Sequence, residues 1–578
     1  MQTVQQQLQN AVESALSTLG ADTASVAPDA LKVVPTANAQ FGDYQWNGAL
    51  PLAKTLKTNP RALAQQLVEK LDVEGISETP EIAGPGFINF RLKPQFIAQM
   101  AAHALQDDNL GVPRTSTPRT VVVDYSGPNV AKPMHVGHIR STIIGDAIAR
   151  LLRFSGHNVI TDNHVGDWGT QFGKLIIGWK KYLDEAALQS DPIGEMERLY
   201  KLVNAQSDSD PTVADEARAE TARLQNGDAE NRRIWETLRE LSQQQFDEIY
   251  GRLDIRFDHT LGESFYNDRL NDVVRDLKER GLARDSEGAV IVPFDAPPQL
   301  QDRPLLVQKS DGAALYGTTD LATIRYRIEQ WHPDEIVYVV DARQSLHFQQ
   351  VFEAARLWGC DAVLRHVSFG SILGEDGKPI KTRSGESVRL KDLLDEAQSR
   401  ALEIVREKNP DLTDEQQHEV ARVIGIGAVK YADLSQNRTS DYIFSWDKML
   451  AMQGNTAPYL QYAYVRIRSI FRRAQEQGIA TDRVLDEMVL EQSAEQDLAK
   501  FILRFPLAIE TALSDYRINA LNDYLFELAQ KFTSFYDACP VLKSDEPQRS
   551  SRLALCDLTS RVLKQGLSLL GIETIEQM

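Results

Sequence analysis

Residues 120–161 hold the pattern that most restricts what this chain can fold into. The run "TVVVD" is continuous, apolar and β-branched, as expected for a strand buried in a parallel sheet. After a polar loop, apolar residues recur from Ile139 to Leu151 with the 3.6-residue period of a helix, and Gly156 is placed to end it. A second strand-like run, "NVIT", follows. This strand–loop–helix–strand unit predicts a doubly wound, Rossmann-type nucleotide-binding fold.

The loop inside this unit reads "PNVAKPMHVGH" and carries the residues with the most chemistry. It contains neither G-x-G-x-x-G nor G-x-x-x-x-G-K-[ST], so neither dinucleotide nor P-loop binding is indicated. A helix that begins directly after a strand favours a bound anion, and His135 and His138 can donate hydrogen bonds to phosphate oxygens. Gly137 leaves room for a flat base or ribose, and Lys132 adds a mobile positive charge. The loop therefore favours chemistry on a phosphate.

Two alternatives for the histidines stay open. A metal site needs a third and a fourth ligand, and the nearest candidates, His157 and His164, are poorly placed for that role. The H-E-x-x-H motif does not occur, and we predict no protein-held metal. The two histidines could also be structural residues whose hydrogen bonds are satisfied inside the protein.

Bulk properties restrict the class of protein. At 578 residues the chain is too long for one core, so about two to four domains are expected. No apolar run approaches the roughly 18–20 residues that span a bilayer, and the N-terminus lacks a signal-peptide pattern. Three cysteines without a C-x-x-C pair favour the reducing cytoplasm. The net charge of −19 does not exclude an anionic partner, because a local basic stripe can override it.

Four segments of different character follow one another. Residues 1–110 predict a small α/β domain that closes with a strand after a Gly-Pro-Gly turn. Residues 111–370 predict the Rossmann domain, interrupted over about 165–300 by a charged helical insertion. Residues 371–450 hold a loop rich in Gly and Lys, "GEDGKPIKTRSGE", and residues 451–578 predict an all-helical bundle. The expected fold class is therefore multidomain α/β.

Several motifs together resemble the arginyl-tRNA synthetases, a family of class I aminoacyl-tRNA synthetases. "PNVAKPMHVGHIRSTIIGD" resembles the HIGH signature of that class. "HVGDWGTQFGKL", "GAALYGTTDLATIRYR", "VYVVDARQSLHFQQVF", "GAVKYADLSQNRTSDYIF" and "NTAPYLQYAYVRIRSI" follow in the order found in the family. "FGDYQWNGALPLAK" resembles its additional N-terminal domain, which binds the tRNA elbow, and the C-terminal helices resemble its DALR anticodon-binding domain. The resemblance covers nearly the whole chain.

The resemblance implies an arginine–tRNA ligase. ATP, bound with Mg²⁺, would activate L-arginine to arginyl-adenylate with release of pyrophosphate. The arginyl group would then pass to the 3′-terminal adenosine of tRNA(Arg) by way of the 2′-hydroxyl, releasing AMP. Arginine activation would require tRNA, and the protein would be a monomer with no membrane partner. No protein nucleophile is needed, so catalysis would be positioning and charge stabilisation at the α-phosphorus.

One loop departs from the pattern of the class. Class I enzymes usually carry a KMSKS loop whose second lysine meets the ATP phosphates, but "GKPIKTRSG" has Thr382 near that position. The resemblance implies that Lys132 substitutes for the missing lysine, and the alternative is that the loop is a solvated basic turn. The implied catalytic positions are Lys132, His135, His138, Lys378 and Lys381, and the implied ATP contacts add Gly137, Gly370, Thr382 and Arg383.

A pocket for arginine needs carboxylates that accept paired hydrogen bonds from a guanidinium. Asp124 ends the first strand and would face the crevice at the carboxyl edge of the sheet. Asp320 lies four residues after Tyr316, so the two share a face if the segment is helical. Either aspartate could instead cap a helix or form a structural salt bridge. The resemblance implies an arginine-binding set of Asp124, Asn129, His135, Tyr316, Asp320 and Gln344.

Candidate tRNA contacts occur near both ends of the chain. Arginines gather in "AYVRIRSIFRRAQ" with no acid among them, and we interpret this stripe as contacting tRNA phosphates. A solvated helix face is the alternative. In the N-terminal segment, Asn38 and Phe41 resemble positions that the family uses near the tRNA elbow. The arginines of the stripe are Arg466, Arg468, Arg472 and Arg473.

Two other functional classes remain compatible with parts of the sequence. A small-molecule nucleotidylyltransferase fused to helical domains would share H-x-G-H, and it would exchange pyrophosphate without amino acid or tRNA. A non-catalytic tRNA-binding protein is disfavoured, because the predicted arginine and ATP positions are intact.

Overall fold

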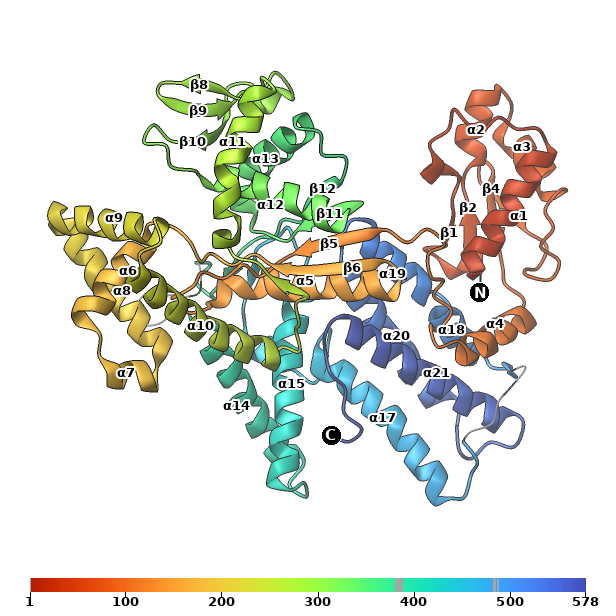
Figure 1. Ribbon diagram of the computed structural model, residues 1–578. Coiled ribbons are helices and arrows are strands. Elements are labelled where there is room, and N and C mark those ends of the chain that lie inside the picture. The colour runs from red at the N-terminus through yellow and green to blue at the C-terminus, as the bar shows by residue number, and fades with distance from the viewer. Residues whose placement is uncertain (1, 379, 381–387, 482–484, 486–487) are drawn as a thin grey trace.

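A parallel sheet of five strands lies at the centre of the molecule (Figure 1). The computed structural model describes residues 2–378, 380, 388–481, 485 and 488–578. The strand order is β12-β11-β5-β6-β7, and every neighbouring pair runs in parallel. The strands are β5 (Thr120–Asp124), β6 (Asn158–Asn163), β7 (His259–Thr260), β11 (Glu335–Tyr338) and β12 (Val363–His366). The Rossmann-type core predicted from residues 120–161 is confirmed.

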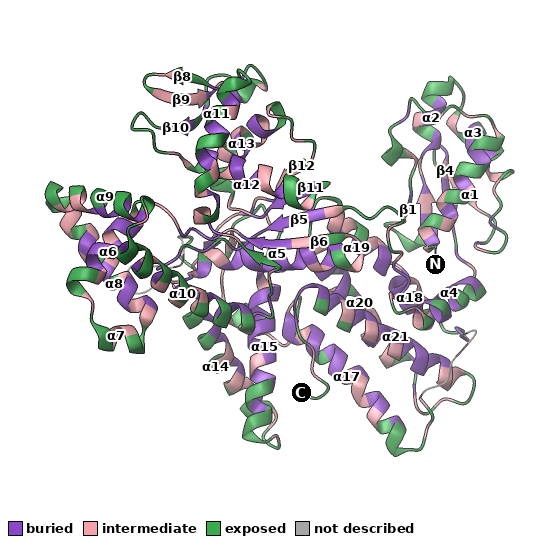
Figure 2. Cartoon of the chain, viewed as in Figure 1, coloured by how far each residue is buried: buried purple, intermediate pink, exposed green. Residues whose placement is uncertain are grey.

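The helix that joins β5 to β6, α5 (Val136–Phe154), is buried along most of its length (Figure 2). It contacts both strands, and α14 (Leu390–Lys408), α15 (Asp414–Leu434) and α19 (Phe505–Ser514) also pack against it. A helix covered in this way has no free face on which to shift. The first turn of α5, where the two histidines lie, is therefore held in place from several sides.

The insertion after β6 begins with five helices. They are α6 (Gln171–Tyr182), α7 (Glu185–Ser190), α8 (Pro192–Ser209), α9 (Pro211–Gln225) and α10 (Ala229–Arg252). They form a separate lobe beside the sheet, at the left of Figure 1. Its core is a cluster of buried apolar residues that includes Phe172, Met196 and Leu238.

Residues 253–308 differ from the predicted helical insertion. The structure has a short helix, α11 (Leu270–Glu279), and an antiparallel sheet of β8 (Arg284–Ser286), β9 (Ala289–Val292) and β10 (Leu305–Gln308). Between β8 and β9 the chain turns at Glu287 and Gly288, whose φ angles are 51° and 82°. The insertion is mostly helical, as predicted, but these strands were not expected, because strands of three or four residues are too short to give a clear period of two.

Two helices then frame the carboxyl edge of the sheet. They are α12 (Tyr316–Trp331), which precedes β11, and α13 (Ser345–Leu357), which follows β11 after a single 3₁₀ turn at Ala342–Gln344. The two helices pack against each other, and both contact β10. Residues from both helices therefore meet near the ends of the central strands.

The N-terminal domain stands to one side of the central sheet (Figure 1). Its own antiparallel sheet has the order β1-β2-β4-β3. Its elements are α1 (Val4–Thr18), β1 (Val33–Pro35), β2 (Tyr44–Trp46), α2 (Ala49–Leu56), α3 (Pro60–Val68), β3 (Glu81–Ala83) and β4 (Phe87–Phe90). The next helix, α4 (Pro94–Gln106), packs against α18 (Ser493–Ile502) and α21 (Gln548–Leu569). This helix links the N-terminal domain to the C-terminal helices.

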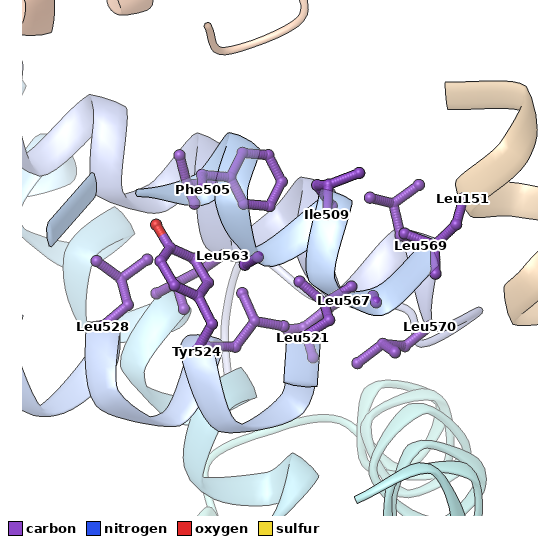
Figure 3. Close-up of a cluster of buried hydrophobic side chains, with 14 of the residues drawn as sticks. Leu151, Phe505, Ile509, Leu521, Tyr524, Leu528, Leu563, Leu567, Leu569 and Leu570 are labelled. Atoms are coloured by element: carbon purple, nitrogen blue, oxygen red, sulfur yellow. The ribbon is translucent and has the colours of Figure 1, made fainter. Parts of the chain in front are cut away.

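The C-terminal region is helical, as predicted from about residue 450. Besides α18, α19 and α21 it contains α16 (Trp446–Met449), α17 (Ala457–Glu476) and α20 (Asn519–Ala538). Figure 3 shows an apolar cluster in which Leu151 of α5 lies beside Leu569 of α21, so these helices dock directly on the central domain. Within the described residues, no helix combines the length and apolar character needed to cross a membrane.

Candidate active site

Hydrogen bonds from neighbouring elements hold the loop between β5 and α5. The Ser126 N–H donates to Ser141 Oγ at 2.8 Å, and the Gly127 N–H donates to Asn163 Oδ1 at 3.0 Å. Ser126 and Ala131 have left-handed φ angles of 75° and 60°, a conformation that costs free energy in a residue with a side chain. The surrounding contacts maintain this shape.

The two histidines at the start of α5 are arranged as a pair of hydrogen-bond donors. His135 Nδ1 accepts the Gly137 N–H at 3.0 Å, and His138 Nδ1 accepts the His135 N–H at 3.0 Å. In a neutral imidazole whose Nδ1 accepts, the proton is on Nε2. Burial lowers the pKa of His138 to about 3, and burial together with Arg343 and Lys132 lowers the pKa of His135. Near pH 7 both rings are therefore neutral and both present an Nε2–H.

Both predicted ATP-contacting glycines have a steric reason to be glycine. A Cβ on Gly137 would lie 2.8 Å from Cε1 of His135, the ring that caps α5. A Cβ on Gly370 would lie 2.6 Å from Asp441 Oδ1 and 2.7 Å from the Ser440 carbonyl carbon. The sequence analysis explained Gly137 by the space that a ligand needs, and the structure adds the space that the capping histidine needs.

Two exposed cations lie near the histidines. Lys132 is exposed, and its Nζ lies 5.1 Å from the centre of the Tyr200 ring on α8. Arg343 is 85 % exposed, its guanidinium is paired with Asp341 at 2.8 Å, and its charge contributes to the lowered pKa of His135. The sequence analysis missed Arg343, although the motif "VVDARQ" placed it directly after β11. A polyanionic ligand at the histidines would meet both cations.

The segment that resembles a KMSKS loop is anchored on both sides near the start of α5. Before it, β13 (Ile372–Leu373) pairs in parallel with β14 (Tyr442–Ile443). After it, the Val136 N–H donates to the Val388 carbonyl at 2.9 Å, and the Leu390 N–H donates to the Met134 carbonyl at 2.8 Å. Lys378 is exposed. The predicted Lys381, Thr382 and Arg383 lie outside the described residues.

The arginine-binding prediction for α12 depended on a helical segment, and that segment is helical. Tyr316 is 68 % exposed, at the first turn. Asp320, one turn later, is 2.5 Å from His347 Nε2 on α13. Burial alone would lower the pKa of His347, but the hydrogen bond and charge of Asp320 outweigh burial and raise it. His347 therefore neutralises part of the charge of Asp320.

A second carboxyl group, which feels the charge of Asp320, was missed by the sequence analysis. Glu263 begins the 3₁₀ segment Glu263–Arg269, and burial, with the charges of Asp167 and Asp320, raises its pKa to about 8. Asp167 holds the start of this segment, because its carboxylate accepts the Ser264 N–H at 2.8 Å and the Ser264 hydroxyl at 2.6 Å. Glu263 and Asp320 are distant in sequence, and only the fold brings the charge of Asp320 close enough to raise the pKa of Glu263. No local pattern in the sequence could therefore have predicted a role for Glu263.

Asp124 already has a guanidinium partner within the protein. Arg327 of α12 is fully buried, and its Nη2 donates to Asp124 Oδ2 at 2.6 Å and to Asp162 Oδ2 at 2.8 Å. Burial raises the pKa of Asp124, although Arg327 opposes that shift. The structural salt bridge that the sequence analysis left open is thus present at Asp124. Two carboxylates facing one guanidinium also leave an excess of negative charge at this edge of the sheet.

The other predicted arginine contacts are two amides. Asn129 is exposed in the loop between β5 and α5, and it forms an isolated parallel bridge with Gly166. Gln344 is exposed at the end of the 3₁₀ turn before α13. Residues 343–347 therefore contribute to both halves of the site, because Arg343 influences His135 while His347 binds Asp320.

The predicted tRNA contacts lie away from this centre. In the N-terminal domain, Asn38 caps a 3₁₀ turn through a 2.9 Å bond from the Gln40 N–H, and Phe41 is 47 % exposed. An exposed aromatic ring beside a fixed turn can stack on an unpaired base.

The arginine stripe on α17 divides into two groups. Arg468 Nε is 2.9 Å from Glu576 Oε2, and Arg472 Nη1 donates to the Glu576 carbonyl at 2.7 Å, so these two arginines bind the C-terminal tail. Arg466 lies over the Tyr536 ring and 3.8 Å from Asp537. Arg473 is exposed.

Family models match all three parts of the chain. The family model of the catalytic domain of class I tRNA synthetases (R) matches residues 100–446. A DALR anticodon-binding domain matches residues 460–578, and an arginyl-tRNA synthetase N-terminal domain matches residues 3–92.

Relatives of similar length share close to half of their residues with this chain. An arginine–tRNA ligase of Cellvibrio japonicus is 48 % identical over 94 % of this chain and 95 % of its own length. One of Chromobacterium violaceum is 46 % identical over the whole of both chains. Among solved structures, the arginyl-tRNA synthetase of Plasmodium falciparum is 31 % identical, covers 100 % of both chains and has a TM-score of 0.84. That of Thermus thermophilus is 27 % identical, covers 99 % of this chain and 100 % of its own, and has a TM-score of 0.83.

Proposed function

Because the chain belongs to the arginyl-tRNA synthetase family and is an arginine–tRNA ligase, we propose that its adenylate-forming centre lies between the histidines of α5 and the carboxylates around α12. The established reaction joins L-arginine to tRNA(Arg) at the expense of ATP. Its two small substrates have opposite charges, and the two sides of the proposed centre differ in charge to match. The single observation that carries the proposal is the joint presence of neutral Nε2–H donors at His135 and His138 and of the acidic pair Asp320 and Glu263.

On the ATP side, we propose that Nε2–H of His135 and of His138 donates to oxygens of the triphosphate. The N-terminus of α5 adds its partial positive charge at the same place. Lys132 and Arg343 would move toward the β- and γ-phosphates as pyrophosphate departs, Arg343 leaving its pair with Asp341, and Gly370 would contact the nucleoside. Mg²⁺ would enter bound to the ATP phosphates. The chain then lowers the barrier by holding donors where negative charge develops, with no protein nucleophile.

On the arginine side, we propose that Asp320 and Glu263 bind the substrate guanidinium. The charge of the incoming guanidinium favours the ionised form of Glu263, which is largely protonated near neutral pH without it. Tyr316 would cover the side chain, and Asn129, Gln344 and His135 would orient the α-amino and α-carboxyl groups. Asp124 contributes through its pair with Arg327 and Asp162, as part of the negative floor of the pocket.

For tRNA, we propose that residues 1–110 meet the elbow through Asn38 and Phe41 and that residues 451–578 read the anticodon region. Arg466 and Arg473 are the arginines of α17 best placed for phosphates, since Arg468 and Arg472 hold the C-terminal tail. Residues 111–370 form the catalytic domain, and residues 371–450 follow the acceptor stem. We further propose that the enzyme acts as a monomer in the cytoplasm.

ATP–pyrophosphate exchange with each amino acid, with and without tRNA(Arg), tests the proposed chemistry. We expect exchange with arginine alone, and only when tRNA is present. Exchange with a substrate that is not an amino acid, unaffected by tRNA, would instead indicate a small-molecule nucleotidylyltransferase. Binding of tRNA without exchange under any condition would indicate a non-catalytic protein.

A further inference from the structure

Arg140 is a buried arginine inside the helix that carries the two histidines. It lies two residues after His138, its side chain is 1 % exposed, and no part of the proposed chemistry uses it. Burying a guanidinium costs several kcal/mol unless its charge and its N–H groups find partners. The partners of Arg140 therefore indicate what its burial achieves.

Three segments distant in sequence converge on this guanidinium. Nη1 donates to the Gly370 carbonyl at 2.8 Å and to the Ser440 carbonyl at 3.1 Å. Nε lies 3.1 Å from a carboxylate oxygen of Asp433 on α15. The rings of Phe369 and Tyr442 flank the guanidinium, with their centres 5.7 Å and 5.3 Å away.

These contacts fix the entrance to the loop that resembles KMSKS. Gly370 lies two residues before β13, and the chain leaves β13 into that loop. The Ser371 N–H donates to Asp441 Oδ1 at 2.5 Å, so the strand that Arg140 holds is itself tied to the segment before β14. Main-chain bonds also tie this segment, from the Gly370 N–H to the Arg438 carbonyl at 2.9 Å and from the Ala342 N–H to the Phe369 carbonyl at 3.1 Å. Arg140 is the side chain that joins it to α5 beside the histidines.

The exit of the same loop is held differently. There the main chain of Val136 donates to Val388 and that of Leu390 donates to Met134, so the exit bonds directly to the residues on either side of His135. Changing a side chain leaves these backbone bonds in place. Arg140 is thus the group whose removal would displace one end of the loop while the other end stays fixed.

We propose that Arg140 is a positioning residue for the ATP step. It sets Gly370 and the loop entrance at the correct distance from the Nε2–H groups of His135 and His138. Its planar fork serves two carbonyls and a carboxylate together, which a lysine ammonium on a flexible stem does not reproduce. The inference rests on the proposed ATP site, and a displacement of about 1 Å in such a site lowers the rate by about 100-fold.

The test compares Arg140→Lys with Arg552→Lys in steady-state pyrophosphate exchange. Arg552 is a matched control, because it also pairs with a buried carboxylate, Glu495 at 2.6 Å, and donates to a main-chain carbonyl, Pro540 at 2.9 Å. We expect R140K to lower kcat/KM for ATP by about 30- to 100-fold while KM for arginine changes less than about twofold. R552K should leave both values within about twofold.

A second variant keeps the proposal testable if R140K does not fold correctly. Asp441→Ala removes the bond to the Ser371 N–H at an exposed side chain, without disturbing a buried charge. We expect a smaller loss of kcat/KM for ATP, about three- to tenfold, with KM for arginine unchanged. The thermal melting of each variant, followed by circular dichroism, separates misfolding from mispositioning.

The proposal is overturned if R140K and D441A both retain wild-type kcat/KM for ATP. It is also overturned if either well-folded variant raises the KM values for ATP and arginine equally, because general loosening of the fold would act on both. His138→Ala distinguishes this failure from failure of the proposed ATP site. A normal H138A enzyme would refute the site itself, whereas an impaired H138A with a normal R140K refutes only the role of Arg140.

Discussion

The ATP side and the arginine side of the proposed centre handle charge in opposite ways. The ATP side presents neutral imidazoles whose protons are on Nε2, because backbone N–H groups occupy both Nδ1 atoms. Its two full positive charges, Lys132 and Arg343, lie at exposed positions. The arginine side holds carboxylates that are half-buried or buried, and it lowers their charge with partners inside the protein.

The difference follows from the cost of burying each substrate charge. A triphosphate arrives with its own cation and needs directed donors, which a neutral group can supply without a desolvation cost of its own. A guanidinium needs full counter-charge, and several uncompensated carboxylates close together would repel one another. The protein avoids that repulsion with Arg327 under Asp124, with His347 beside Asp320, and with a proton on Glu263.

The largest expected effect is the loss of arginine binding and activation, with ATP binding retained. Asp320→Asn keeps the shape of the side chain but removes the charge that faces the guanidinium. We expect kcat/KM for arginine to fall by about 1,000-fold, since one partner of a desolvated charge pair is lost, while KM for ATP changes less than about threefold. Pyrophosphate exchange with each substrate varied in turn measures both. An arginine KM and kcat within about threefold of wild type would remove Asp320 from the pocket.

The next largest expected effect is a slower reaction of ATP, with arginine binding retained. His138→Ala removes one fixed donor, and we expect kcat of pyrophosphate exchange to fall by about 100-fold, the loss typical of one donor to a developing oxyanion. KM for arginine should stay within about threefold. Because His138 has a pKa of about 3, this loss should not vary between pH 6 and 8. A loss that appeared only below pH 7 would contradict the neutral-donor role.

An intermediate effect concerns the exposed cation. Lys132→Ala should lower kcat/KM for ATP by about 10- to 100-fold, as expected for the loss of a charge-assisted hydrogen bond. Lys378→Ala provides the matched control at an exposed lysine of the loop that resembles KMSKS. Should K378A prove the more damaging variant in the same assay, the loop would carry the phosphate role and Lys132 would not.

A smaller expected effect is the release of a proton from Glu263 when arginine binds. With a pKa of about 8, Glu263 is mostly protonated at pH 7, and a bound guanidinium should displace up to about one proton. Isothermal titration of arginine in buffers of different ionisation enthalpy measures this release. The Glu263→Gln variant should release fewer protons, and equal proton release from both proteins would exclude Glu263 as the source.

The raised pKa of Glu263 also predicts how the stability of the folded protein changes with pH. The folded chain keeps the proton up to a pKa of about 8, whereas an unfolded chain loses it near the ordinary value of 4.5. The folded state therefore binds more protons between these values, and its stability falls as pH rises from about 4.5 to 8. Melting temperatures across that range should fall less steeply for E263Q than for the wild type.

The smallest expected effect concerns the binding of tRNA, the third charged substrate. Arg473→Ala should raise KM for tRNA a fewfold and reduce the slope of log KM against log salt by about one. Arg468→Ala should change that slope less, because Glu576 already neutralises Arg468. If R468A had the larger effect on the salt slope, the tail contact would not compete with tRNA for this side chain.

Local patterns in the sequence were enough to predict the framework of the centre. The run of β-branched residues, the 3.6-residue period after it and the second strand defined β5, α5 and β6, because each depends on the periodicity of a single backbone segment. The helical period also predicted that His135 lies beside His138 and that Asp320 lies one turn from Tyr316. The motifs around these residues also indicated the family, because they are local in sequence.

The charge arrangement was decided by tertiary structure. Asp124 meets Arg327 across 203 positions, and Arg140 reaches Gly370 across 230. Glu263 approaches Asp320 from a different segment, and the C-terminal tail approaches Arg468 from the end of the chain. A carboxylate has the same sequence signature whether it binds substrate, a buried arginine or a proton. Docking of distant elements determines its neighbours and the water it loses, and so determines which of these roles it takes.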